Sequence, residues 1–504
     1  MNNFLIIWFY RVFVALVLGI GVPLCFWLEW KYERQVAVTG CTVRVSTKRN
    51  TVIFVAPWVL PFMMAVYWLI MTLFVGPALS TASLLELSLQ LLVLLSLYFA
   101  LLLLLLPLLR RTISARACAT LWLLPVFLCY NLAVWQRTFV PPLVVLSIPN
   151  RLGPLLLGIW LTGAAAVALW YLISHLRFRR RLLKDAQPIN DADVVNLWWD
   201  EQRQALLKRH IRLLTSPAAT SPLTIGLFGR TMCTVLPQRD YTLDQYQLIF
   251  RHELRHVQRR DVDTKCFYIF CKALCWFNPL VWVAVRKASA DLELSCDEMV
   301  VYDAEDDTRR EYASLLLETA GDERGLTTCL SASASSLRRR LKGVMVPRER
   351  SSGVLALGLM MATLVLCSGL ILVTTVSGTA GELLFPHPED VSFQSVWVSL
   401  DSGSAHVKEA HVEEPSPVVN QALLDQLSSL PVTRLSTGST LPGSDSPRLS
   451  SFLHDGEHVQ ILALTDGLCS LTTLDDSKEV SILYQVDGPV DWEGLYALIE
   501  EGSA

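Results

Sequence analysis

Long apolar runs are the feature of this sequence that most limits what it can fold into. Of its 504 residues, 52% are hydrophobic, and the mean hydropathy is +0.40. A helix needs about 20 apolar residues to cross a bilayer. Runs of roughly this length lie at 4–28, 52–76, 87–109, 119–135, 155–176 and 353–376. The sequence therefore predicts a multi-span α-helical membrane protein, with about five spans before residue 178.

Basic residues predict which side of the membrane each segment faces, because short loops rich in Lys and Arg stay in the cytoplasm. Such residues gather after the first run, after the third run and at Arg177–Arg181. The loops between them, near 77–86 and 136–152, contain only Arg137 and Arg151. We expect a cell-membrane protein with its N-terminus outside, residues 177–352 in the cytoplasm and the C-terminal segment outside.

The C-terminal segment differs in charge from the rest of the chain. From residue 379 onward it has 20 acidic and 4 basic residues, and its single cysteine, Cys469, cannot form an internal disulfide. Short alternating stretches and two probable helices predict a small α+β domain, interrupted by a loop at 436–451 rich in Ser, Gly and Pro. The predicted division is an N-terminal membrane domain at 1–176, a mainly helical enzyme domain at 177–352, a last transmembrane helix at 353–376 and the extracellular domain at 377–504.

His252, Glu253 and His256 form an HExxH motif within the stretch "LIFRHELRHVQRRD". The two histidines are four residues apart, so they share one face of a helix and can bind one Zn²⁺. A catalytic zinc keeps three protein ligands and an open position for water. Glu253 is the predicted general base that takes a proton from the attacking water.

"ADLELSCDEMV" supplies the predicted third ligand, Glu293, which lies 37 residues beyond His256. Asp297 follows one helical turn later, where a carboxylate can accept the free ring N–H of a ligand histidine. Cys296 is an alternative ligand, but free cysteines more often behave as small buried hydrophobes. His210 has no partner at ligand spacing.

The segment 266–285 is apolar enough to be a further span. It cannot cross completely, because Glu293 would then lie on the opposite side of the bilayer from His252. We expect it to lie against the membrane or among the spans, where Lys272 and the pair Asn278-Pro279 are shielded by protein.

Several motifs in this order resemble the BlaR/MecR-type sensor-transducers, a family of integral membrane zinc peptidases. They include "SPLTIGLFGRTMCTVLP", "FRHELRHVQRRD", "WFNPLVW", "ELSCDEMV" and "SSLRRRLKGVM", and the likeness covers most of residues 155–376. The resemblance implies a gluzincin mechanism, with His252, His256 and Glu293 as zinc ligands and Glu253 as base and acid.

The resemblance also implies that an outer sensor activates proteolysis of a cytoplasmic winged-helix repressor, sometimes with self-cleavage before the last span. Arg338–Arg340 lie in the corresponding segment, although an arginine run beside a membrane usually only anchors topology. The C-terminal domain departs from the beta-lactam-binding members, because neither Lys408 nor Lys478 completes an SxxK motif. The ligand of an outer sensor therefore stays unknown, and covalent beta-lactam sensing is not expected.

The leading interpretation is thus a membrane zinc endopeptidase that transmits a signal as an antirepressor. Two alternatives are a housekeeping membrane protease and a non-catalytic receptor or scaffold with a structural zinc. The expected partners are the repressor, membrane lipid and an unknown extracellular ligand, with a homodimer left open. The basic clusters flank spans and lack stacking elements, so no direct nucleic-acid binding is expected.

Overall fold

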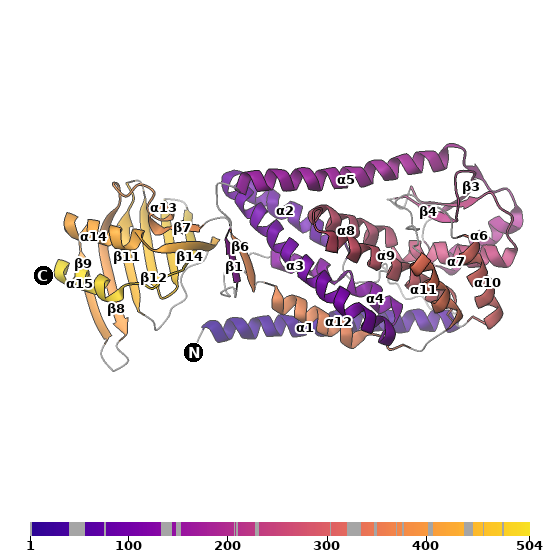
Figure 1. Ribbon diagram of the computed structural model, residues 1–504, viewed down its shortest axis with the longest axis horizontal. Helices are drawn as coiled ribbons and strands as arrows, with labels where there is room; N and C mark the ends of the chain where they lie inside the picture. The colour runs from indigo at the N-terminus through magenta and orange to yellow at the C-terminus, as the bar shows by residue number, and fades with distance from the viewer. Residues whose placement is uncertain are drawn as a thin grey trace.

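A computed structural model shows a helical part and a C-terminal β-sheet domain, arranged end to end (Figure 1). It describes residues 3–39, 56–74, 77–132, 144–147, 153–205, 207, 210–226, 231–302, 304–319, 334–346, 350–368, 370–374, 377–401, 407–437, 447–456, 458–475 and 478–503. The predicted loop charges Arg44, Lys48, Arg49, Arg137 and Arg151, and most of the Ser-rich loop at 436–451, lie outside these ranges.

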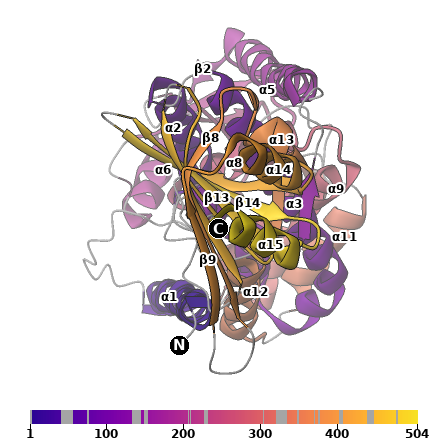
Figure 2. The same cartoon turned by 90° about the vertical axis from the view of Figure 1, so that its left-hand side faces the viewer.

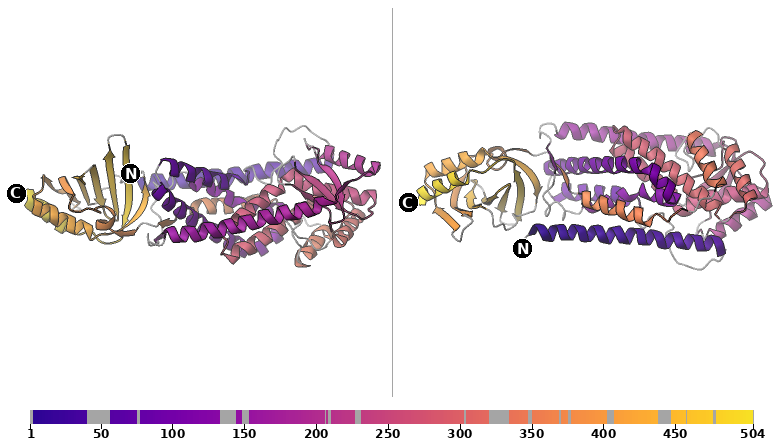
Figure 3. Two further views of the ribbon diagram at one scale, coloured as in Figure 1. Left: turned by 90° about the horizontal axis from the view of Figure 1, so that it is seen from above. Right: turned by 60° about the horizontal axis from the view of Figure 1, so that its bottom comes forward.

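Within the residues that the structure describes, three helices are long and apolar enough to cross a membrane: Val12–Lys31, Leu84–Thr112 and Leu155–Lys184. They lie within α1 (Asn3–Thr39), α3 (Pro77–Thr112) and α5 (Gly153–Lys184). In Figures 1 and 3, α1 and α5 run along the length of the helical part. Because α5 is continuous to Lys184, the predicted domain boundary at residue 177 falls inside a helix.

The other predicted spans are shorter. The span predicted at 119–135 is wrong for the part that the structure describes, because residues up to 132 form not one long helix but α4 (Ala115–Leu121) followed by the 3-10 segment η1 (Leu124–Leu132). Pro125 lacks a backbone N–H, and Leu124 and Val126 are fully buried, so neighbouring helices rather than lipid cover this region. The helices α2 (Val59–Phe74) and α12 (Val354–Cys367) have 16 and 14 residues.

Glycines let α1 and α12 approach closely. A Cβ atom built on Gly358 would lie 2.8 Å from the carbonyl oxygen of Gly19. Small residues at such crossings bring helix backbones into van der Waals contact, which drives helix association in membranes. Gly353, at φ 81°, precedes α12, and a Cβ there would lie 2.5 Å from that of Ala117. This position therefore requires glycine for both its conformation and its packing.

The apolar segment 266–285 turns back on itself. It comprises most of α8 (Asp261–Leu274) and the start of α9 (Pro279–Val300). Asn278 caps α9 by accepting the N–H of Leu280 at 3.0 Å, and its Nδ2 donates to Ser96 Oγ of α3 at 2.8 Å. The Asn278 side chain thereby finds its partners within the protein, as a polar group at a break among apolar helices requires.

The end of the helical part farthest from the β-sheet domain contains a small sheet and four helices (Figure 1). The strand order is β2-β3-β5-β4, and only β3 and β5 are parallel. Trp198 and Phe250 pack edge to face at 4.8 Å in the core of this region. Its elements are α6 (Ala192–Gln204), β2 (Gln187–Pro188), β3 (Arg212–Ser216), β4 (Leu223–Ile225), β5 (Cys233–Pro237), α7 (Leu243–Arg259), α10 (Asp306–Glu318) and α11 (Ala334–Met345).

The C-terminal domain is an antiparallel sheet of eight strands in the order β7-β10-β14-β13-β12-β11-β8-β9. Leu423 and Leu427 of α14 and Ile499 of α15 pack with the sheet in one apolar core, and Figure 2 shows both helices on the same face. The strands are β7 (Ser377–Thr379), β8 (Ser392–Asp401), β9 (Val407–Glu413), β10 (Pro431–Thr437), β11 (Arg448–His454), β12 (Val459–Thr465), β13 (Leu468–Asp475) and β14 (Lys478–Val486); the helices are α13 (Ala380–Leu383), α14 (Pro417–Ser428) and α15 (Trp492–Ser503).

Among the described residues, several contacts lie where the sheet domain meets the helical part. The strand β6 (Ile371–Thr374), which follows α12, pairs in parallel with β1 (Val144–Ser147). Arg434 of β10 forms an ion pair at 3.4 Å with Glu86 of α3, and both side chains are buried. The N-terminus lies at this same end of the helical part (Figure 1).

Candidate metal centre

The helix α7 carries the HExxH motif. The Thr242 hydroxyl accepts the N–H of Gln245, and the Gln245 side chain accepts the N–H of Thr242, which forms a capping box at its start. Such a cap satisfies backbone N–H groups that have no partner within the helix. The inward face of α7 contains His252, Glu253 and His256, which are all buried.

Glu293 of α9 meets the two histidines. The Nε2 atoms of His252 and His256 are 3.1 Å apart, and Glu293 Oε2 lies 3.7 and 3.4 Å from them. Two nitrogens bound to one tetrahedral zinc at the usual bond length are about 3.3 Å apart. The structure therefore brings the three predicted ligands together at the separations that a single ion needs.

Asp261 holds His256 from the other side of its ring. Its Oδ2 lies 2.6 Å from His256 Nδ1, and Arg259 Nε lies 3.4 Å from Oδ1 of the same carboxylate. Asp261 is fully buried at the start of α8. A carboxylate in this place accepts the Nδ1–H, so it leaves the lone pair of Nε2 facing Glu293.

Tyr312 of α10 holds His252 in the same way. Its hydroxyl donates to Asp297 Oδ1 at 2.8 Å and lies 2.8 Å from His252 Nδ1, whose N–H it can accept. Asp297 Oδ1 is itself 3.5 Å from His252 Nδ1, so the hydroxyl bridges the pair that the sequence predicted to bond directly. Arg340 of α11 then forms a bidentate ion pair with Asp297, at 2.6 and 2.8 Å.

These partners make the residues fit a cation. When both histidines donate from Nδ1, their Nε2 lone pairs oppose each other at 3.1 Å. Two facing lone pairs repel unless a positive charge lies between them, and zinc is the ion that this combination of imidazoles and a carboxylate typically binds. His252, His256 and Glu293 are thus the residues that would hold it.

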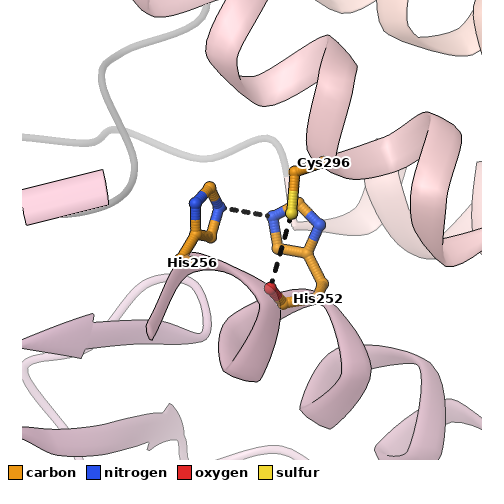
Figure 4. A group of neighbouring side chains, drawn as sticks. All are labelled: His252, His256 and Cys296. Carbon is orange, nitrogen blue, oxygen red and sulfur yellow. Dashed lines mark hydrogen bonds between the residues drawn. The ribbon is translucent and has the colours of Figure 1, made fainter. Parts of the chain in front are cut away.

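Cys296 lies closer to the histidines than the sequence suggested. Ligand atoms of His252, His256 and Cys296 all lie within 4.8 Å of one another, and the thiol points toward the backbone oxygen of His252 at 3.6 Å (Figure 4). Burial opposes ionisation of this thiol, yet His256 and His252 lower its pKa to about 6. Burial lowers the pKa of His252, but Cys296 and Glu293 raise it to about 10. Cys296 is therefore a competing ligand.

Sequence reasoning missed Asp261, Tyr312 and the contact of Arg340. Asp261 ends the quoted stretch five residues after His256, and a carboxylate just past an HExxH helix was its only signal. Tyr312 gave none, because its partner His252 is 60 residues away. Arg340 was interpreted as part of a topology anchor, although it contacts the buried Asp297. His210, for which no ligand role was predicted, stacks edge to face on Trp199.

Residues 145–344 match the family model described as BlaR1 peptidase M56. Through this segment, the chain is similar to the BlaR/MecR-type family. It is 27% identical over 214 residues to "Regulatory protein BlaR1" of Bacillus licheniformis, covering 42% of this chain and 35% of that protein. It is 25% identical over 150 residues to "Methicillin resistance mecR1 protein" of Staphylococcus aureus and of Staphylococcus epidermidis, covering 29% of this chain and 25% of each relative.

The family segment includes α7, α8, α9, α10 and nearly all of α11, and thus all the side chains of the candidate centre. It ends before α12 and the C-terminal sheet. This similarity supports a metal-dependent peptidase and a membrane protein. Because the aligned segments span about a third of BlaR1 and a quarter of mecR1, the activity and partners of the whole chain are matters for proposal.

Proposed function

We propose that the chain is an integral membrane zinc endopeptidase of the gluzincin type that transmits a signal across the membrane. The observation that carries this proposal is the set of 3.1, 3.4 and 3.7 Å separations among His252, His256 and Glu293. A structural site closes its coordination with a fourth protein ligand and needs no adjacent base. Here Glu253 is buried beside the ligand His252, which favours catalysis over a scaffold.

Each residue then has a part in hydrolysis of a peptide bond. A bound zinc would polarise the scissile carbonyl and lower the pKa of water. Glu253 takes a proton from the attacking water as the water oxygen bonds to the carbonyl carbon. It then delivers that proton to the amine nitrogen as the C–N bond breaks. Asp261 and Tyr312 keep the ring orientation of His256 and His252 fixed throughout.

For orientation, we propose an outside N-terminus, a cytoplasmic peptidase end and an extracellular C-terminal domain. The basic loops support this arrangement. The start of α1 and the sheet domain also lie at the end of the molecule opposite α7, as this orientation requires (Figure 1). A ligand of the outer domain would act on the helical part through Glu86 and Arg434 or through α12, which follows α11 and its Arg340. The relative's name, "Regulatory protein BlaR1", supports a regulatory role. The proposed substrate is a winged-helix repressor.

The test is Glu253→Gln in the full chain, assayed for bound zinc and for cleavage of a winged-helix repressor encoded beside it. General acid–base catalysis contributes about 10²–10⁴-fold, so we expect a loss of that size with zinc retained. Glu318→Gln, at an exposed position on α10, is the matched control and should cleave normally. Undiminished cleavage by Glu253→Gln, or a folded wild-type chain without zinc, would overturn the proposal.

Deleting residues 379–504 separates signalling from housekeeping proteolysis. A transducer should lose its response to the external signal while the peptidase end keeps its zinc. Unchanged proteolysis in cells after the deletion would instead favour the housekeeping protease.

A further inference from the structure

A second polar site lies on the opposite face of α9's ligand region, where α3, α4, α9 and α11 meet. It is a cavity of about 180 Å³. Four cationic side chains line it, with one carboxylate: Arg110, Arg339, Lys342, Arg350 and Asp291. The cavity can hold a group much larger than one water molecule, since a water takes about 30 Å³ of liquid.

Two of the four cations are already paired. Arg110 contacts Asp291 at 2.7 Å, and Trp122 Nε1 donates to the same carboxylate at 2.8 Å. Arg350 Nη1 contacts Glu298 at 2.6 Å, while its buried Nε has no hydrogen-bond partner among the described residues. The paired carboxylates therefore leave donor capacity on these arginines unused.

The other two cations come from α11 and add uncompensated charge. Within the described part of the chain, no carboxylate lies at ion-pair distance from Arg339 or Lys342. Burial and the neighbouring Arg110 lower the pKa of Arg339, against the attraction of Asp291. An anion in the cavity would relieve this repulsion and accept the free N–H groups.

The position of the cavity indicates the kind of anion. Arg110 lies near the end of the apolar stretch Leu84–Thr112, at the level where a span leaves the hydrocarbon. The remaining wall is largely apolar, with Cys118, Leu294 and Val346 among its residues, and Lys342 is exposed at the cavity. Basic pockets between membrane helices on the cytoplasmic side suit phospholipid headgroups.

We propose that this cavity binds a phosphate-bearing anion, and that the anion is the headgroup of an acidic phospholipid. The phosphate lies among Arg339, Lys342 and Arg350, and the apolar wall accommodates the start of the acyl chains. This site goes beyond the proposed peptidase activity and does not depend on it. It borders the metal centre, because Leu294 follows Glu293 and Arg339 precedes the Arg340 that holds Asp297.

The test measures retention of phosphatidylglycerol by native mass spectrometry and by thermal unfolding of the full chain. The chain is placed in nanodiscs of phosphatidylcholine, with or without phosphatidylglycerol. Arg339→Gln with Lys342→Gln is the test variant. Arg111→Gln with Arg338→Gln is the matched control, because it removes two charges from exposed positions on α3 and α11 that do not line the cavity.

We expect the wild type and the control to retain phosphatidylglycerol and to unfold at higher temperature with it than without it. The test variant should bind it at least tenfold more weakly while unfolding normally in phosphatidylcholine. Equal binding by the test and control variants would overturn the proposal, as would no preference in the wild type. Inorganic phosphate is titrated in the phosphatidylcholine arm, and stabilisation equal to that by the lipid would overturn the lipid assignment in favour of a soluble anion.

Glu253→Gln distinguishes this site from the proposed activity. That variant should retain phosphatidylglycerol as the wild type does even when cleavage is lost, so failure of one proposal leaves the other intact. Loss of lipid binding in Glu253→Gln would contradict the independence of the two sites.

Discussion

The two ends of the molecule are built from different interactions. At the peptidase end, His256, Asp261, Asp291 and Asp297 are almost wholly inaccessible to solvent, and each contacts a partner of complementary charge or hydrogen-bonding capacity. The core of the C-terminal sheet consists of apolar side chains such as Phe385, Phe393 and Leu462. Burying a charge costs free energy unless the charge is paired. An accumulation of buried charges is therefore better evidence for a functional site than for added stability. The buried charges therefore indicate a functional site at the peptidase end.

The largest expected effect concerns the third ligand. Glu293→Ala should abolish stoichiometric zinc binding, because it removes the carboxylate 3.4 and 3.7 Å from the two imidazoles. Cys296→Ala should keep zinc, since its thiol is the competing and not the assigned ligand. Elemental analysis of the purified, folded variants checks both. Zinc retained by Glu293→Ala and lost by Cys296→Ala would reassign the set to two histidines and a cysteine.

The next effect concerns Asp297 and Arg340, the ion pair behind His252. Arg340→Ala leaves Asp297, which is fully buried, without its bidentate partner. An uncompensated buried charge of this kind lowers the free energy of unfolding by about 3–5 kcal/mol. Arg338→Ala removes an exposed neighbour on the same helix and should change the free energy of unfolding by less than about 0.5 kcal/mol. Equilibrium unfolding in detergent compares the two variants. Equal free energies of unfolding would show that the ion pair between Arg340 and Asp297 does not stabilise the fold.

A smaller effect is expected for the carboxylate behind His256. Asp261→Asn keeps the shape of the side chain but weakens the acceptor that orients the ring. Loss of such a partner reduces metal affinity by about 10–100-fold. Competition for zinc with a chelator measures the change, and Asp263→Asn, on the first turn of the same helix, is the control. Matching affinities for these two variants would remove Asp261 from the centre.

The smallest effect tests whether the membrane part depends on close packing rather than on charge. Gly358→Ala places a methyl group 2.8 Å from the Gly19 carbonyl oxygen, so α1 and α12 must move apart. Overpacking of this kind lowers the free energy of unfolding by about 1–3 kcal/mol. Gly21→Ala, with no atom within 4 Å of the added carbon, should be neutral or slightly stabilising. Thermal unfolding measures both variants. A lower unfolding temperature for Gly21→Ala than for Gly358→Ala would contradict the close crossing of α1 and α12.

Local sequence patterns predicted the helix of the candidate metal centre, because the spacing of its histidines determines their geometry. Residues four apart on a helix share a face, so His252 and His256 could be placed together before any tertiary structure was known. Glu293 was predicted from the acidic pattern of a later helix, and this assignment implied that the segment 266–285 does not cross the bilayer. The turn between α8 and α9 agrees with that inference. Apolar length alone was less reliable, since most residues from 119 to 128, in α4 and η1, are buried among other helices.

By itself, the sequence determined the motif helix, the apolar runs, the basic loops and the acidic sheet-forming C-terminal segment. Only the tertiary structure decided which buried partners orient the ligands and where unpaired cations gather. Tyr312 meets His252, Arg340 meets Asp297, and Arg110 approaches Arg339, through contacts that join residues far apart in the chain. Such contacts leave no periodic pattern in the sequence, because they depend on how α3, α9, α10 and α11 pack. Pairing a buried charge contributes free energy only when those helices have packed together.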